Sequence, residues 1–205
     1  MLKLYYLQGA CPLVPHTALH WAKAEFEAVR LERGEQKQPE FLALNPQGSV
    51  PLLTDGDWAL AQNVAILDYL HEVYPQAQIF GSGDARQKAK ARQWLALANS
   101  DLHGKFGWLF GAAHLLGDEN AQNELRGNAI ASINQIYQQA EKVLQNQAYL
   151  CGDEITIADV YFYVTSRWAN MFAWDWSDFA VLPDYFARVE RNAGVQAALK
   201  EQGLA

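Results

Sequence analysis

Cysteine is scarce in this sequence of 205 residues, which contains only Cys11 and Cys151. Two cysteines give no disulfide framework, and no cluster of cysteine and histidine has the spacing of a zinc site. The sequence has no run of about 20 apolar residues, the length that a membrane-spanning helix needs. Its start, MLKLYYLQGAC, lacks the long apolar segment of a signal peptide. We therefore expect a protein of the reducing cytoplasm, with no membrane partner.

Basic charge is also in short supply. The chain has 16 lysines and arginines against 23 aspartates and glutamates, a net charge of −7. This balance argues against a nucleic-acid partner, which requires a basic face. Apolar residues make up 50% of the chain and charged residues 19%, as in ordinary globular proteins. The length allows one large domain or two modest ones, and the abundant aromatic residues supply bulk for a core.

The first part of the chain predicts an α/β domain with the order βαβαββα. An Asp55-Gly56 pair between two short apolar runs is a strong hairpin signal. A helix opens at Asn63, carries apolar residues at helical spacing, and stops at Pro75. The predicted strands are 3–6, 27–31, 52–54 and 58–60, and the other helical segments are 12–23 and 39–44.

No strand is needed beyond Gly81-Ser82-Gly83, a segment typical of a linker. The sequence predicts a first domain at 1–76, a linker at 77–86 and an all-helical domain at 87–205. Helical patterns cover 85–116, 120–147, 156–171 and 183–200.

Thr156-Ile157-Ala158-Asp159 has the form of a capping box. The Thr156 hydroxyl is expected to accept from the backbone N–H of Asp159, and the Asp159 carboxylate to reach back to the N–H of Thr156. This is a structural device, and we assign Asp159 no catalytic role.

Cys11 stands where the first strand gives way to a helix, directly before Pro12. Proline favours the first helical position, which would make Cys11 the N-cap. There the free N–H groups and the helix dipole favour a thiolate, so the thiol is expected to be more acidic than its usual pKa of about 8.5. The alternative is a small buried residue that fills the corner, and position alone leaves both open. Because Val14 replaces the second thiol of a Cys-x-x-Cys motif, a reactive Cys11 would need an external thiol.

Two further segments bear on this corner. A cis peptide at Val50-Pro51 would place the backbone of Val50 beside the thiol. Gln62-Asn63 begins the third predicted helix, with Asn63 as N-cap, and such a helix start suits a carboxylate, although most bind only water.

The long helix of the second domain carries a stripe of small and polar residues. A cleft wall presents such a stripe more often than a core helix does, although a lone helical histidine is usually structural. The stripe consists of Ala96, Asn99, Ser100, His103 and Gly107. We interpret His16 as a packing or capping residue, and His20, His71 and His114 as surface residues.

Five segments occur in the order seen in cytosolic glutathione transferases, and the chain resembles this superfamily over essentially its whole length. N-P-x-G-x-V-P at 45–51 and T-I-A-D at 156–159 are fairly specific for the superfamily. The G-A-C motif, with L-H at 102–103, is similar to the bacterial beta class. The five segments are KLYYLQGACPLVPHTAL, FLALNPQGSVPLL, LAQNVAILDYL, YLCGDEITIADVYFY and LPDYFARVERNAGVQAAL.

The resemblance implies a thioredoxin-like N-terminal domain, a helical C-terminal domain and a homodimer. It implies glutathione as cosubstrate, conjugated to a small, hydrophobic electrophile in detoxification. Cys11 would lie at the glutathione sulfur, with which it can form a mixed disulfide. His103 would help bind glutathione and tune its thiol.

The resemblance also implies the binding residues. Val50, next to cis-Pro51, would pair with the cysteinyl backbone of glutathione, and Gln62 with Asn63 would hold its γ-glutamyl end. Arg33 and Lys37 are the alternatives for the glycyl carboxylate, because the loop after Leu31 is shorter than in the family. The remaining expected binding residues are Tyr6, Asn99 and Ser100.

Several positions depart from the family pattern. Pro12 removes an N–H donor from the first helical turn, and Gln62 replaces the glutamate usual in the class. Asn63 stands where serine or glycine is commoner, and Ala96 where asparagine is common. Two alternatives to conjugation stay open, and these departures motivate the second of them. One is thiol–disulfide exchange by Cys11 with glutathione, and the other is a non-catalytic binding or regulatory protein.

Overall fold

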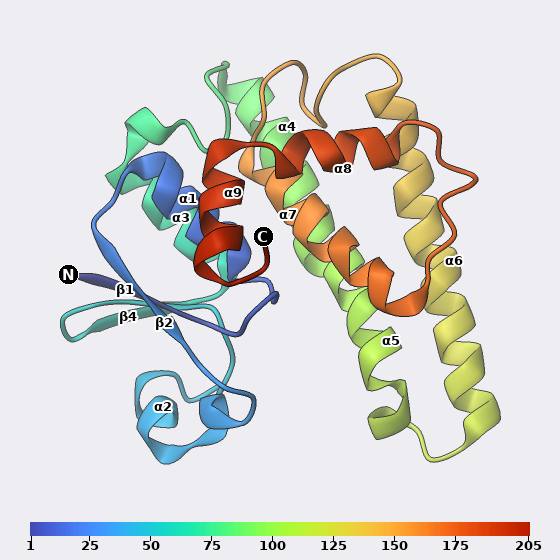
Figure 1. The fold of residues 1–205 in the computed structure, drawn as a ribbon, viewed down its shortest axis with the longest axis horizontal. Helices are drawn as coiled ribbons and strands as arrows, with labels where there is room; N and C mark the ends of the chain where they lie inside the picture. Colours follow the sequence, from blue (N-terminus) through green and yellow to red (C-terminus); the bar gives the residue numbers. More distant parts are fainter. The chain divides into compact units, whose positions relative to one another are not determined.

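The computed structural model describes all residues from 1 to 205. The chain forms two compact units, Met1–Ser82 together with Glu190–Ala205, and Gly83–Val189 (Figure 1). None of the helices is long and apolar enough to cross a membrane.

A four-stranded mixed sheet forms the centre of the first unit. Its order is β2-β1-β3-β4, with β1 parallel to β2, and β3 antiparallel to both β1 and β4. The strands are β1 (Leu2–Tyr6), β2 (Phe26–Arg30), β3 (Leu52–Asp55) and β4 (Trp58–Ala61). In β1, Leu2, Leu4 and Tyr6 are buried while the residues between them are half-buried, which is the period-2 pattern of a strand. The four predicted strands and the hairpin at Gly56, whose φ is 58°, are confirmed.

The helices of the first unit are α1 (Leu13–Ala22), α2 (Pro39–Leu44), α3 (Asn63–Val73) and α9 (Ala193–Glu201). Figure 1 shows α1 and α3 together on one side of the sheet, away from α2. Every residue of α1 from 13 to 19 is buried, so this helix has no solvent face there and needs cover on more than one side.

The end of the chain provides part of that cover, because α9 packs against α1. The Asn192 side chain caps α9 by accepting from the N–H of Gly194 at 3.0 Å, and it also accepts from the Trp21 indole at 2.9 Å. A Cβ at Gly194 would lie 2.4 Å from the Trp21 ring, so this close approach requires glycine. The sequence pattern assigned 183–200 to one helix of the second domain. In the structure the helix breaks before Asn192, and 190–205 belongs to the first unit.

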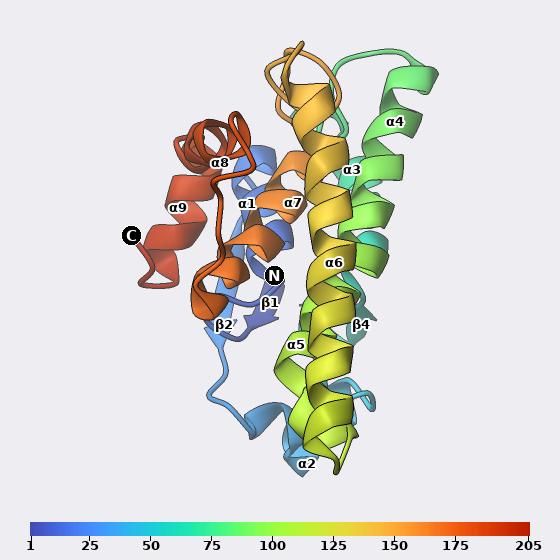
Figure 2. The same cartoon turned by 90° about the vertical axis from the view of Figure 1, so that its right-hand side faces the viewer.

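The second unit is entirely helical, as the sequence predicts. Its helices are α4 (Ala85–Ala96), α5 (His103–Leu115), α6 (Glu119–Leu144), α7 (Ile157–Arg167) and α8 (Leu182–Glu190). Figure 2 shows the long α6 running beside α5. A π-helical turn at Leu97–Leu102 interrupts the predicted helix 85–116 and joins α4 to α5.

Helix α7 is buried along nearly its whole length and begins at the predicted capping box. The Asp159 carboxylate accepts from the N–H and from the hydroxyl of Thr156, both at 2.8 Å. The same carboxylate accepts from the N–H of Leu150 at 2.8 Å and from the Tyr185 hydroxyl at 2.9 Å. Asp159 therefore joins three segments of the core, which agrees with a structural role.

Candidate functional site

The corner before α1 brings three of the predicted site residues together. The Cys11 thiol is 7% exposed and donates to the carbonyl oxygen of Val50, with Sγ and O 3.8 Å apart. The Val50-Pro51 peptide is cis, which confirms the prediction that this turn places the Val50 backbone beside the thiol.

The acidity expected for Cys11 is wrong. Helix α1 begins at Leu13 with Pro12 as its N-cap, so Cys11 lies in the turn before the helix and does not cap it. Burial raises the pKa of the Cys11 thiol to about 11, and a hydrogen bond from the Asn63 side chain opposes this rise only in part. Desolvation outweighs the helix dipole here, and the residue is a neutral thiol at neutral pH.

The start of α3 lies one residue earlier than the sequence suggested. Gln62 is the N-cap and Asn63 the first helical residue. Asn63 is buried, whereas Gln62 is exposed and donates from its side-chain amide to Oε1 of Gln47 at 3.0 Å. Gln62 has a φ of 76°, a conformation that costs free energy for a residue with a side chain and that clusters at ligand sites.

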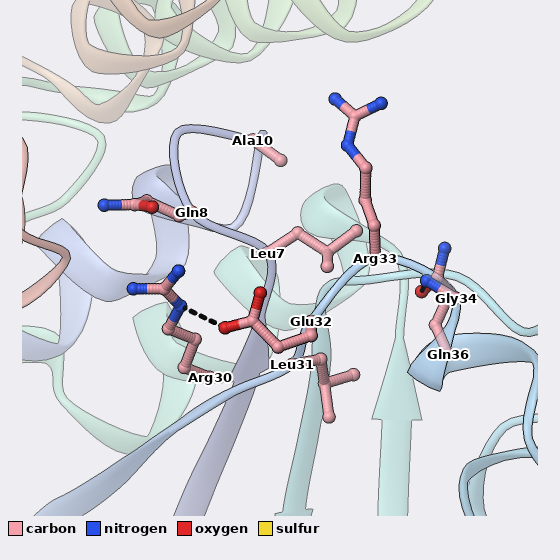
Figure 3. A pocket seen from close by; sticks show the side chains of 9 residues that line it. All are labelled: Leu7, Gln8, Ala10, Arg30, Leu31, Glu32, Arg33, Gly34 and Gln36. Carbon is pink, nitrogen blue, oxygen red and sulfur yellow. Dashed lines mark hydrogen bonds and ion pairs between the residues drawn. The ribbon is translucent and has the colours of Figure 1, made fainter.

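A cavity of about 690 Å³ opens beside the loop that leads to Cys11 (Figure 3). Arg30 in its wall is paired with Glu32, with Nε and Oε1 3.1 Å apart. Figure 3 shows the Arg33 side chain extending away from that pair. The lining residues are Leu7, Gln8, Ala10, Arg30, Leu31, Glu32, Arg33, Gly34 and Gln36.

The two alternatives for the glycyl carboxylate differ in their surroundings. Arg33 lines the cavity, is exposed and makes no ion pair. The Lys37 ammonium is exposed too, but it donates to the carbonyl oxygen of Gln47 at 3.2 Å and does not line this cavity. Sequence reasoning missed the other lining residues, since a loop of mixed polarity carries no spacing signal.

Tyr6 is placed differently from the other expected binding residues of this unit. It is 4% exposed on the buried face of β1, and its ring lies 5.8 Å from that of His16. Burial raises the pKa of the Tyr6 hydroxyl. These surroundings are those of a core residue, and a binding role for Tyr6 stays a prediction.

In the second unit, a hydrogen-bond chain fixes the state of His103. The Tyr161 hydroxyl donates to Oδ1 of Asn99 at 2.8 Å, so its oxygen is left to accept from Nδ1 of His103, 3.0 Å away. The proton of the neutral imidazole therefore lies on Nδ1, and Nε2 carries a lone pair. Burial lowers the pKa of His103, which keeps the ring neutral at neutral pH.

The π-helical turn determines which stripe residues take part. Asn99 turns its amide to Tyr161. The exposed Ser100 hydroxyl has one proton to donate and lies 2.8 Å from the Ala96 carbonyl oxygen and 2.6 Å from the Asp101 carboxylate. Ser100 is thus occupied within its own helix. Tyr161 was missed because nothing in the sequence pairs position 161 with position 103.

Aromatic rings surround His103 within its unit. Its ring centroid lies 4.8 Å from that of Trp168, which in turn lies 5.9 Å from both Phe106 and Phe110. Phe106 is fully buried, whereas Phe110 is 44% exposed. Phe110 and the half-buried Trp168 therefore offer apolar surface near the histidine.

The chain matches two family models, that of the glutathione S-transferase N-terminal domain over residues 1–72 and that of the C-terminal domain over residues 101–192. It is 38% identical to glutathione S-transferase GST-4.5 of Xanthomonas campestris, over 99% of this chain and 100% of that protein. The solved glutathione S-transferase of Xylella fastidiosa is 38% identical, with a TM-score of 0.93 and full coverage of both chains.

A sphingomonad glutathione S-transferase solved in complex with glutathione is 29% identical to this chain, with a TM-score of 0.84. The match covers 99% of this chain and 100% of that one. The sheet, the cis-proline corner and the helical unit, together with these full-length matches, show that the chain belongs to the glutathione S-transferase family.

Proposed function

We propose that the protein conjugates the thiolate of glutathione to small, hydrophobic electrophiles. Family membership and the glutathione complex of a relative support this activity. The G-A-C motif at the thiol corner and the L-H pair at 102–103 favour a beta-class enzyme.

The Cys11 corner is the observation that carries the proposal. We assign the cysteinyl part of glutathione to the backbone of Val50, its γ-glutamyl end to Gln62 and Asn63, and its glycyl carboxylate to Arg33. A neutral Cys11 donates a hydrogen bond from its S–H group. In the free protein this S–H group points to the Val50 carbonyl. If it rotates to the sulfur of bound glutathione, its hydrogen bond stabilises the thiolate form of the cosubstrate.

His103 is the candidate for the base that deprotonates the glutathione thiol. Its Nε2 lone pair accepts the proton that leaves the glutathione thiol, and Tyr161 holds the tautomer in which this lone pair exists. The thiolate then attacks the electrophile, for which we propose the aromatic surface of Phe110 and Trp168. In the displacement of an aryl halide, a carbon–sulfur bond forms and the halide leaves with the electron pair of the broken bond.

Thiol–disulfide exchange by Cys11 is the less favoured activity. With a pKa of about 11, roughly one Cys11 thiol in three thousand is ionised at pH 7.5, and only the thiolate attacks a disulfide. A mixed disulfide between Cys11 and glutathione would form slowly for the same reason. The apolar surface near His103 also favours an enzyme over a purely regulatory protein, because a hydrophobic second substrate can pack against it.

The conjugation of glutathione to a chloronitrobenzene, with calorimetry of glutathione binding, tests the proposal. We expect saturable binding of one glutathione per chain and a conjugation rate well above that of the uncatalysed reaction. Absence of binding by the folded protein would overturn it in favour of a partner-binding role.

We also propose a homodimer with a role in detoxification. Gel filtration with light scattering tests the dimer and should give twice the chain mass of 23.0 kDa. Both cysteines are free, which supports a reducing cytoplasm as the compartment.

A further inference from the structure

Two histidines of α1 meet a glutamate of α9 in the first unit. His16 and His20 are four residues apart, so they share one face of the helix, and their rings stack with centroids 5.3 Å apart. Nε2 of His16 lies 2.7 Å from Oε2 of Glu201, and Nε2 of His20 lies 3.4 Å from Oε1. The three ligand atoms all lie within 4.8 Å of one another.

We propose that His16, His20 and Glu201 bind a divalent cation of the zinc type. Zinc bonds of about 2.0–2.1 Å in a tetrahedron separate neighbouring ligand atoms by about 3.3–3.4 Å, which is the present distance from His20 to Glu201. Two imidazoles and one carboxylate form a set that binds zinc and leaves a fourth position for water. The Glu201 side chain is 46% exposed, so it is free to adjust and it gives the ion a path from solvent.

The state of His20 points independently to a ligand. Its Nε2 atom is buried and makes no hydrogen bond, although it faces the carboxylate of Glu201. Buried polar atoms without a partner are uncommon in folded proteins. A cation between the two groups would satisfy both of them.

Phe26 holds the two imidazoles in place. Its ring meets each of them edge to face, with both centroid distances 5.4 Å. The nitrogen ligands are therefore preorganised, and only the carboxylate must move when an ion binds.

The second partner of His16 ties this site to the thiol corner. Gln202 accepts from the N–H of Gly9 at 3.1 Å through Oε1, which leaves its amide nitrogen to donate to Nδ1 of His16 at 3.2 Å. The His16 proton then lies on Nε2, where it is donated to Glu201. A metal ion bound at Nε2 requires the other tautomer of the neutral imidazole, so this proton must move to Nδ1.

The Gln202 amide must then rotate so that its oxygen accepts from Nδ1–H. The hydrogen bond from the N–H of Gly9, in the loop before Cys11, to the Gln202 oxygen is then lost. Because this hydrogen bond must break, we expect the site to bind zinc with lower affinity than a purely structural zinc site. The same change couples the ion to the loop before Cys11.

The bound ion would join residues far apart in the chain, because His16 and Glu201 are separated by 185 positions. It would hold α9 on α1 and stabilise the folded state by mass action. No local pattern in the sequence points to this site, since only the fold brings Glu201 to the histidine pair.

The test uses full-length protein, stripped of metal by a chelator and titrated with zinc chloride in a calorimeter. We expect one ion per chain with a micromolar dissociation constant. At excess zinc the midpoint of thermal unfolding should rise by about 3 °C or more. Cobalt chloride, as a coloured substitute, should give the visible absorption bands of a four- or five-coordinate ion.

His20→Ala should abolish saturable zinc binding and the thermal shift, while the apo protein stays folded, because His20 Nε2 makes no hydrogen bond. Glu201→Ala is a second variant at an exposed side chain and should weaken binding at least tenfold. His114→Ala, at an exposed histidine of the second unit, is the matched control and should bind as the unmodified protein does. Absence of 1:1 binding, or undiminished binding by His20→Ala, would overturn the proposal.

Discussion

Cys11 in the first unit and His103 in the second are both kept uncharged, but by different means. Burial alone raises the pKa of the Cys11 thiol to about 11 and leaves it a hydrogen-bond donor. Burial lowers the pKa of His103, and Tyr161 additionally fixes the proton on Nδ1, which leaves Nε2 an acceptor. In the reaction that we propose, Cys11 donates a hydrogen bond to the glutathione sulfur and His103 accepts its proton. The charge in the proposed reaction belongs to the cosubstrate.

Removing the imidazole of His103, the proposed proton acceptor, should have the largest effect on conjugation. His103→Ala should lower kcat/KM for conjugation about 100-fold, the low end for loss of a general base. Glutathione affinity, measured by calorimetry, should change much less. Unchanged turnover in a folded variant would show that the proton leaves by another route.

The pH dependence of conjugation reports on the same histidine. His103 must be neutral to act, and its pKa is lowered from the usual value of about 6.5. The conjugation rate of the wild-type enzyme should therefore stay constant as the pH is lowered past 6.5. It should fall only when the pH drops through the lowered pKa of His103. The acid limb of the profile of kcat/KM should disappear in His103→Ala.

Loss of the Tyr161 hydroxyl, which holds the proton of His103 on Nδ1, should lower the activity less. Tyr161→Phe removes the hydroxyl that accepts from His103 Nδ1, so the proton is free to occupy either nitrogen. We expect kcat to fall about tenfold, equivalent to one hydrogen bond of about 1.4 kcal/mol. A change confined to the thermal midpoint, with kcat and the pH profile intact, would mean that Tyr161 is purely structural.

On the side of the thiol, Arg33→Ala should raise KM for glutathione about fivefold and leave kcat nearly constant, since an exposed charge contributes modestly to binding. Lys37→Ala is the matched control, because that ammonium already binds the carbonyl of Gln47. If Lys37→Ala raised KM for glutathione and Arg33→Ala did not, Lys37 would be the residue that binds the glycyl carboxylate.

The smallest effect is expected at the cysteine itself. Cys11→Ala should keep conjugation within about threefold of the wild-type rate, because a neutral thiol contributes only one weak donor. Disulfide exchange, assayed with a glutathionylated peptide, should be lost altogether. A collapse of conjugation would instead make Cys11 ionised or covalently engaged during turnover, and would remove the contrast between the two regions.

Local sequence signals predicted most of the fold. The hairpin at Gly56, the cis turn at Val50-Pro51 and the capping carboxylate of Asp159 each depend on a few neighbouring residues, and all three are confirmed. Two quantities that depend on long-range packing could not be read in this way. The burial of Cys11 reverses the acidity expected from its local position. The link from Tyr161 to His103 joins residues 58 positions apart.

Histidines illustrate the same limit. His20 and His71 were expected at the surface, but both are half-buried, and His71 packs against Phe80 with ring centroids 5.1 Å apart. His114 is exposed, as expected, and His16 is fully buried, in line with a packing role. Helical spacing shows which side chains share a face. It does not show what covers that face.

The docking of α9 on α1 has a consequence for biosynthesis. During translation the first helix emerges early, whereas the segment that covers it is made only after the whole second unit. That segment includes Gln202, with its contacts to Gln8 and Gly9. The nascent first domain therefore keeps part of its apolar surface uncovered until α9 has emerged from the ribosome.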